Sequence, residues 1–251
     1  MDSVFITGGT TGIGLELAKK YLAKGYKVGI CGRDEHKFNE AFPVKPLHLH
    51  FYPIDVSNRS ALQETIKSFS KPIGLNLLIA NAGIAYPIKS KVPDFNLTYK
   101  MIDVNIKGVL YAFEAALEIM IPQGKGQLVG ISSVAGFNGF PGTSGYSASK
   151  AAVMKICESF SVDLKSLGID VTCICPGFVD TPLTQVNKHP MPFMITAEKA
   201  SDLIVKAIKR KKIRYSFPFI MLFLVYFLSI LPRSIFVYIM SKKGFNYSKE
   251  D

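Results

Sequence analysis

The fold of this chain is decided by its amino-terminal stretch, Val4-Phe5-Ile6-Thr7-Gly8-Gly9-Thr10-Thr11-Gly12-Ile13-Gly14. Its apolar start predicts a strand, and the apolar spacing from Ile13 to Ala23 predicts a helix. Glycines between a strand and a helix let the backbone approach a pyrophosphate, and the helix N-terminus offers N–H donors and a positive dipole end. The stretch therefore predicts a dinucleotide-binding turn, the alternative being a plain tight turn.

The rest of the chain alternates apolar runs with helical patterns. Further strands are predicted at 27–31, 47–54, 75–80, 127–132, 170–175 and 213–217, and helices at 61–69, 97–120, 146–167 and 197–211. Apolar strands separated by helices form a parallel sheet covered on both faces, and right-handed crossovers make it doubly wound. We therefore predict an α/β fold of about seven strands in residues 1–217, with a ligand crevice at the carboxyl ends of the strands.

The composition fits a globular core with a basic surface. The 251 residues are 48% hydrophobic and 20% charged, which argues against global disorder. Lys and Arg outnumber Asp and Glu by 30 to 19, an excess that suits nucleic acid, an anionic membrane or an anionic cofactor. The basic block at residues 209–214 immediately precedes the most apolar part of the chain. That order favours a membrane surface over nucleic acid, the alternative being a solvated helix end.

The cysteines indicate neither a metal site nor a disulfide framework. Cys31, Cys157, Cys173 and Cys175 lack metal-ligand spacing, so we expect no metal and a reducing, cytoplasmic compartment. The N-terminus enters the first strand almost directly, and we expect no cleavable signal peptide.

A possible proton-transfer pair lies in Tyr146-Ser147-Ala148-Ser149-Lys150. Residues four apart share one face of a helix, so Tyr146 and Lys150 would project into one site. An ammonium beside a phenol lowers the phenol's pKa from about 10, which makes a tyrosine usable as a proton donor and acceptor. The alternative is an ordinary exposed tyrosine and lysine. Ser133 lies upstream, and its spacing to Tyr146 selects it over the adjacent Ser132 as a third member of the site.

The second strand ends in a segment that bears on the choice of nucleotide, Cys31-Gly32-Arg33. An acidic residue at this position usually binds the ribose 2′-hydroxyl of NAD, whereas an arginine can pair with the 2′-phosphate of NADP. Asp34 can reach a ribose itself, or it can cap the helix that starts at Glu35. We favour NADP, with NAD as the alternative.

These residues resemble the short-chain dehydrogenase/reductase superfamily, whose fold is Rossmann-like. Five motifs occur in order over about residues 3–215: the glycine turn, Asp55-Val56 after the third strand, Asn81-Ala82-Gly83 after the fourth, the Ser133, Tyr146 and Lys150 set with Asn105, and Pro176-Gly177 followed by Asp180-Thr181. The cofactor-binding residues implied are Gly8, Thr10, Thr11, Gly12, Ile13, Gly14, Arg33, Asp55, Val56, Asn81, Ala82, Gly83, Tyr146, Lys150, Pro176, Gly177, Val179 and Thr181.

The resemblance also implies catalytic roles. Tyr146 would donate a proton to a substrate carbonyl oxygen as hydride arrives, and Ser133 would hydrogen-bond that oxygen. Lys150 would lower the pKa of Tyr146 and hold the nicotinamide ribose, with Asn105 supporting a water relay behind it. Asn105 can alternatively be a solvated or capping residue.

The C-terminal extension, residues 218–251, departs from the family pattern. Residues 217–231 are fifteen residues without a charge, fewer than the about twenty of a spanning helix. Pro232-Arg233 interrupts the run, and a second apolar run ends before Lys242-Lys243. We expect two short helices lying in one leaflet on the cytoplasmic face of a membrane, the alternatives being a hydrophobic dimer interface or a substrate lid.

The sequence thus predicts an NADPH-dependent reductase for a ketone or aldehyde of an apolar, lipid-like molecule. Resemblance extends to membrane-bound sphingoid-base, steroid and retinoid enzymes. The loop after Thr181, with Leu183 and residues 191–195, is apolar and either lines the substrate site or packs on itself. Alternatives are an alcohol dehydrogenase working oxidatively and a non-catalytic nucleotide-binding scaffold. The family commonly pairs its subunits, so we expect a homodimer or homotetramer.

Overall fold

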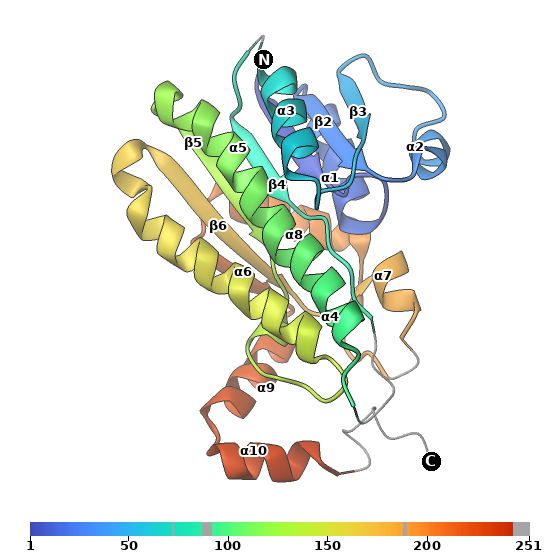
Figure 1. The fold of residues 1–251 in the computed structure, drawn as a ribbon, viewed down its shortest axis with the longest axis vertical. Helices are drawn as coiled ribbons and strands as arrows, with labels where there is room; N and C mark the ends of the chain where they lie inside the picture. Colours follow the sequence, from blue (N-terminus) through green and yellow to red (C-terminus); the bar gives the residue numbers. More distant parts are fainter. Residues whose placement is uncertain (72, 87–91, 188–189, 243–251) are drawn as a thin grey trace.

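A parallel sheet lies between two layers of helices in the computed structural model, which describes residues 1–71, 73–86, 92–187 and 190–242 (Figure 1). The sheet has seven strands in the described residues, all paired in parallel in the order β3-β2-β1-β4-β5-β6-β9. The strands are β1 (Ser3–Thr7), β2 (Lys27–Gly32), β3 (Leu49–Pro53), β4 (Leu77–Ala80), β5 (Gly126–Ile131), β6 (Ile169–Pro176) and β9 (Arg214–Phe217). The predicted doubly wound fold is confirmed.

Alternation along the strands builds two separate cores. Successive strand residues point to opposite faces, so Phe5 of β1 joins one hydrophobic cluster while Val4 and Ile6 join the other. The Phe5 face is covered by α3 (Arg59–Ser70), α5 (Gly108–Gln123) and α6 (Ser144–Asp163). The opposite face is covered by α1 (Gly12–Ala23), α2 (Glu35–Ala41) and α8 (Ala197–Lys209). Apolar side chains on both faces explain why the strands are nearly continuous hydrophobic runs.

The helix predicted at 97–120 is one continuous helical segment with an irregular turn. It consists of α4 (Phe95–Ile102), a π-helical turn η1 (Asp103–Lys107) and α5. Single π-helical turns inside α-helices are frequently found at functional sites. Here the turn contains Asn105, whose side chain is fully buried. The third strand is shorter than predicted, because residues 47 and 48 form a turn before β3.

The C-terminal extension forms the two predicted short helices, α9 (Phe219–Ile230) and α10 (Arg233–Met240). They project beyond the carboxyl ends of the strands, at the bottom of Figure 1. Within residues 1–242 as described, none of the helices has both the length and the apolar character needed to cross a membrane. The end of the extension, including Lys243, lies outside the described residues.

Lys211 of the basic block lies at the opposite edge of the sheet from the extension, which corrects the argument drawn from the position of the block in the sequence. Lys211 pairs with Asp170 at the start of β6, 2.7 Å away, whereas Phe217 pairs with Pro176 at the end of that strand. Asp170 and Pro176 are six residues apart on the extended strand β6, so they lie about 20 Å from each other. Strand β9 therefore carries the chain from the basic block at one edge of the sheet to the extension at the other.

Candidate active site

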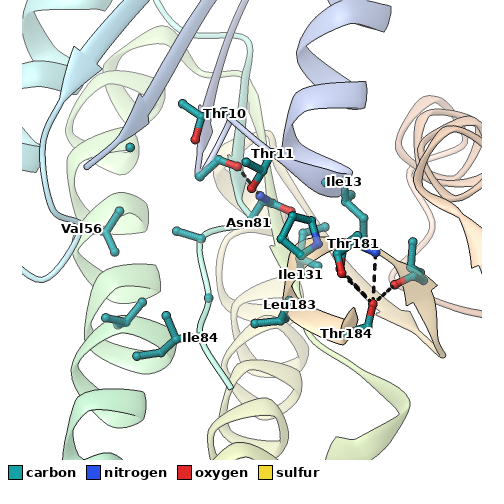
Figure 2. A pocket seen from close by; sticks show the side chains of 18 of the residues that line it. Thr10, Thr11, Ile13, Val56, Asn81, Ile84, Ile131, Thr181, Leu183 and Thr184 are labelled. Carbon is teal, nitrogen blue, oxygen red and sulfur yellow. Dashed lines mark hydrogen bonds between the residues drawn. The ribbon is translucent and has the colours of Figure 1, made fainter. Parts of the chain in front are cut away.

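A pocket of about 300 Å³ opens at the carboxyl ends of the strands (Figure 2). In Figure 2, Val56 and Ile84 lie on one side of it, Thr181 and Thr184 lie on the other, and Asn81 lies between them. The predicted residues that line it are Gly8, Thr10, Thr11, Gly12, Ile13, Arg33, Asp55, Val56, Asn81, Ala82, Gly83, Ser133, Tyr146, Lys150, Pro176, Gly177, Val179 and Thr181. Gly14 and Asn105 are not in the lining, and each lies next to a residue that is: Gly14 beside Gly8, and Asn105 beside Gly83.

The glycine turn has a conformation that other residues reach only with strain. Gly8 and Gly12 have φ values of 69° and 55°, in the left-handed region that favours glycine. A side chain on Gly14 would overlap the Gly8 carbonyl oxygen. Thr11 is the N-cap of α1 and makes no side-chain cap hydrogen bond, so the first N–H groups of the helix are not taken up by its cap. Such a helix N-terminus beside a glycine turn fits a pyrophosphate.

The end of β4 is fastened to this turn by a small hydrogen-bond network. The Thr7 hydroxyl oxygen accepts from the backbone N–H groups of Asn81 and Ala82, both at 3.0 Å. The Asn81 side-chain amide donates to the carbonyl oxygens of Thr7 and Gly8, also at 3.0 Å. Asn81 thus holds the turn in place, and Gly8 approaches Ala82 too closely for a side chain to fit between them.

Two cations lie at the end of the pocket near β2, away from Tyr146 and Lys150. Arg33 is 3.6 Å from Asp55, and both side chains are partly exposed. Asp34 caps α2, because its carboxylate accepts from the Lys37 backbone N–H at 3.1 Å; this bond, with the Lys37 ammonium 3.4 Å away, lowers the pKa of Asp34. The capping alternative for Asp34 is therefore confirmed. Lys37 also lines the pocket. Lys37 was missed in the sequence analysis. The available signal was its place in the first turn of α2, the helix that begins at Glu35, two residues after Arg33.

Tyr146 and Lys150 lie one turn apart on α6, as predicted, and both line the pocket. The Lys150 ammonium nitrogen is 5.7 Å from the centre of the Tyr146 ring and donates to the Ile131 carbonyl oxygen at 2.9 Å. Burial lowers the pKa of Lys150 to about 8. Burial also raises the pKa of Tyr146, opposed by a hydrogen bond with the Ser133 hydroxyl. The prediction that Lys150 lowers the pKa of Tyr146 is thus wrong for this structure, because burial raises that pKa and it is the hydrogen bond with Ser133 that opposes the rise.

The two adjacent serines have different environments. The Ser132 hydroxyl is buried and donates to the Lys150 carbonyl oxygen at 2.7 Å, so it fastens the end of β5 to α6. The Ser133 hydroxyl accepts from the Ala135 backbone N–H at 3.1 Å and lies 3.4 Å from the Pro176 carbonyl oxygen. The interaction with Tyr146 comes from Ser133, which supports its choice over Ser132.

Asn105 fixes the loop that follows β4. Its side-chain oxygen accepts from the Ile84 backbone N–H at 2.8 Å, and its amide donates to the Ile84 carbonyl oxygen at 2.9 Å and to the Ser149 hydroxyl at 3.0 Å. A side chain on Gly83 would lie 3.3 Å from the Lys150 ammonium and 3.4 Å from the Asn105 side-chain oxygen. Asn105 therefore joins the loop to α6 beside Lys150. It is neither a solvated nor a capping residue.

The short helix α7 (Pro182–Gln185) closes the pocket on the side opposite Val56. Thr181 begins it in a capping box with Thr184, whose hydroxyl also donates to the Val179 carbonyl oxygen at 2.6 Å. A side chain on Gly12 would lie 3.0 Å from the Thr181 methyl group, so α7 lies close to the glycine turn. Lining residues on and beside this helix that the sequence reasoning did not assign to the cofactor are Pro182, Leu183 and Thr184.

The apolar loop after Thr181 contributes less to the pocket than its composition indicates. Leu183 lines the pocket, but none of the residues 190–195 does. Ile195 is in β8 (Ile195–Thr196) and packs against the core under α8. Phe193 and Met194 are 47% and 45% exposed. The packing alternative holds for Ile195, and the lining alternative holds for Leu183.

Comparison with known proteins identifies the family. Residues 2–191 match the short chain dehydrogenase family, and the chain belongs to it. An uncharacterized oxidoreductase of Myxococcus xanthus is 34% identical, with 93% of this chain and 94% of that protein covered. An uncharacterized oxidoreductase of Staphylococcus aureus is 38% identical, with 82% and 90% covered. The chain is accordingly an oxidoreductase.

Solved structures agree with this placement. ElxO with NADP bound has a TM-score of 0.76 and 26% identity, and 86% of this chain and 96% of that chain are covered. A variant of ElxO with NADPH bound has a TM-score of 0.77 at the same identity and coverage. The Myxococcus xanthus match covers so much of this chain that it must reach into the C-terminal extension.

Proposed function

We propose that the protein is an NADPH-dependent reductase that converts the carbonyl group of an apolar, lipid-like molecule to an alcohol. The observation that carries the proposal is the convergence of Ser133, Tyr146 and Lys150 beside Pro176-Gly177, in the same pocket as the glycine turn. The bound nicotinamide would supply the hydride. The chain's own residues would supply the proton and the hydrogen bonds to the reacting oxygen.

Tyr146 is suited to donate the proton. Its raised pKa keeps the phenol protonated at neutral pH, as reduction requires. The Ser133 hydroxyl would donate to the oxygen as negative charge develops, and such preorganised donors are a large part of catalysis. The Lys150 ammonium, held by the Ile131 carbonyl oxygen, would bring positive charge under the phenol and replenish the proton.

The choice of NADPH rests on the charges around the far end of the pocket. Arg33 and Lys37 both line it, and two cations there suit a 2′-phosphate. Asp34 also lines the pocket, but its carboxylate accepts from the Lys37 backbone N–H and lies 3.4 Å from the Lys37 ammonium. Binding of NADP by ElxO, a related fold, agrees with this choice.

An apolar substrate is supported by apolar side chains in the pocket. Ile84, Val104 and Leu183 line it together with Tyr146. The outer surfaces of α9 and α10 are also largely apolar, and their exposed large hydrophobic residues are Phe219, Ile220, Phe223, Leu224, Tyr226, Phe227, Ile230, Ile235, Val237 and Tyr238. Sequence positions 218–242 contain no acidic residue. This surface suits a bilayer interface, with Lys242 near lipid phosphates.

We further propose a homodimer formed through the outer sides of α5 and α6. Leu110 and Ile121 on α5 and Val162 on α6 are exposed, with Val162 74% exposed. Light scattering of the purified protein tests this assembly, and a monomer would contradict it.

The experiment that tests the proposed reaction is NADPH oxidation by the purified protein with long-chain ketones and aldehydes in micelles. We expect turnover with apolar carbonyls and little with short polar ones. Tight NADPH binding without turnover across the panel would instead favour the non-catalytic scaffold. Turnover confined to alcohols with NADP would favour the oxidative direction.

A further inference from the structure

The inner side of α9 packs against two segments that bound the substrate end of the pocket. Met221 and Val225 of α9 form a buried cluster with Val134, the residue that follows Ser133. At the start of the extension, the Gly177 backbone N–H donates to the Phe217 carbonyl oxygen at 2.6 Å, and a side chain on Gly177 would lie 3.4 Å from Met221. Helix α9 is therefore joined to the edge of the sheet that carries Ser133.

A buried asparagine joins α9 to the active-site loop, residues 134–143, which connects Ser133 to the helix of Tyr146. Asn138 is 6% exposed, and its amide donates to the Val225 carbonyl oxygen at 2.8 Å. The two residues are 87 positions apart in the sequence. A buried amide left without partners costs free energy, so this contact holds the loop against the helix.

Arg233 completes the junction from the first turn of α10. One guanidinium nitrogen donates to the Asn138 side-chain oxygen at 3.3 Å, and another donates to the Ser229 carbonyl oxygen at 3.1 Å. The second contact places a cation at the C-terminus of α9, where carbonyl groups lack helical partners and the helix dipole favours positive charge. Arg233 is the only basic residue between positions 218 and 241 in the sequence.

We propose that Asn138 and Arg233 form a latch through which the C-terminal extension positions the active-site loop and thereby Ser133. Both are positioning residues, because they act on the substrate site through Val134 and Ser133. Neither lines the pocket, and the glycine turn is not among their contacts. Opening the latch therefore lowers kcat/KM for the carbonyl substrate and leaves nucleotide binding intact. The kinetic part of the test of this latch depends on the proposed carbonyl reduction.

The latch also connects the exposed apolar surface of the extension to the catalytic edge. The same helix that carries the exposed Phe223 and Phe227 carries Val225, whose carbonyl oxygen accepts from Asn138. A surface contact that moves α9 would therefore also move residues 134–143, which directly follow Ser133 in the chain.

The test compares full-length Asn138→Ala, Arg233→Ala and Arg233→Lys with the wild type. Arg210→Ala is the matched control, because Arg210 is an exposed arginine at the other edge of the sheet. Amide hydrogen exchange is measured for residues 134–143 and, as an internal reference, for residues 7–14. Dissociation constants for NADPH are measured by fluorescence, and KM and kcat with a carbonyl that the wild type reduces.

We expect both alanine variants to exchange faster at residues 134–143 than the wild type, with residues 7–14 unchanged. The kcat/KM for the carbonyl should fall about tenfold while the NADPH dissociation constant stays within about twofold. Arg233→Lys keeps the charge but cannot donate from two guanidinium nitrogens to Asn138 and Ser229 at once. Its exchange rate at residues 134–143 and its kcat/KM should therefore lie between those of Arg233→Ala and the wild type. The control should match the wild type in every measurement.

Unchanged exchange at residues 134–143 in folded Asn138→Ala and Arg233→Ala would overturn the latch. An equal loss of protection at residues 7–14 would also overturn it, because the effect would then be general destabilisation. The exchange measurement needs no substrate. If the wild type reduces no carbonyl, the proposed function fails, while the exchange data still decide the latch.

Discussion

The Lys150 ammonium lies 5.7 Å from the centre of the Tyr146 ring, and its hydrogen bond goes to the Ile131 carbonyl oxygen. Burial makes both groups favour their neutral forms: the pKa of Tyr146 is raised, and that of Lys150 is lowered to about 8. The phenol is therefore protonated and able to donate a proton at neutral pH. Of the two groups, the Lys150 ammonium has the pKa closer to neutral pH.

This relationship predicts an alkaline limit to nucleotide use. Lys150 is charged below about pH 8 and loses its proton above it. The kcat/KM for NADPH, which reports groups of the free enzyme, should be level at neutral pH and fall as the pH rises through about 8. Initial rates in buffers of constant ionic strength check this. A profile that stays flat well beyond the predicted limit would show that the charge of Lys150 does not matter.

The cations at the far end of the pocket predict a preference for NADPH that can be removed. Arg33→Ala and Lys37→Ala each delete one charge beside the proposed 2′-phosphate. Each should weaken NADPH binding by about 10- to 100-fold, because a hydrogen bond to a charged group contributes about 1.5–3 kcal/mol. Titration with both nucleotides measures this, and NADH affinity serves as the control because it has no 2′-phosphate. Equal losses for NADH and NADPH would argue against the assignment.

The two adjacent serines predict opposite phenotypes. Ser133→Ala removes the proposed donor to the reacting oxygen, and we expect kcat to fall about 10²- to 10³-fold with little change in the free energy of unfolding. Ser132→Ala deletes the bond to the Lys150 carbonyl oxygen, and should lower the free energy of unfolding by about 1–3 kcal/mol. Steady-state rates and urea unfolding check both. A larger loss of kcat in Ser132→Ala would reverse the assignment.

The exposed side of α9 predicts binding to lipid vesicles. Phe223 and Phe227 are 62% and 51% exposed, so replacing both by serine should leave the fold intact. It should weaken vesicle binding by at least about tenfold, because each phenylalanine contributes about 1.5–3 kcal/mol when buried. Flotation with anionic phosphatidylcholine–phosphatidylserine vesicles measures this. Leu47→Ser is the control, since Leu47 is 87% exposed in the loop before β3. Absence of wild-type protein from the vesicle fraction would refute membrane binding.

Local patterns were sufficient to predict the sheet and most of the pocket. The glycine turn and the segments at Asn81, Ser133 and Pro176 each follow a strand, and parallel strands end at one edge. Their meeting point therefore follows from the order of elements in the sequence. The two helices of the extension followed from Pro232, which interrupts the apolar run.

Features that depend on three-dimensional surroundings were missed. The burial that raises the pKa of Tyr146 comes from the whole packing of α6, so helical spacing to Lys150 alone gave the wrong direction. The basic block adjoins the extension in sequence, but β9 separates them in space. Contacts such as Asn138 with Val225 join positions far apart in the chain, and neither residue carries a local signal of that pairing.

Replacing Tyr146 by phenylalanine tests the central claim most directly, because it removes only the phenolic oxygen that would donate the proton. NADPH oxidation with the best carbonyl substrate and NADPH binding by fluorescence are measured on the same purified Tyr146→Phe protein. The account predicts a loss of turnover by at least about 10³-fold with nucleotide binding and unfolding free energy close to those of the wild type. Carbonyl reduction at a near-normal rate by the folded variant would contradict it.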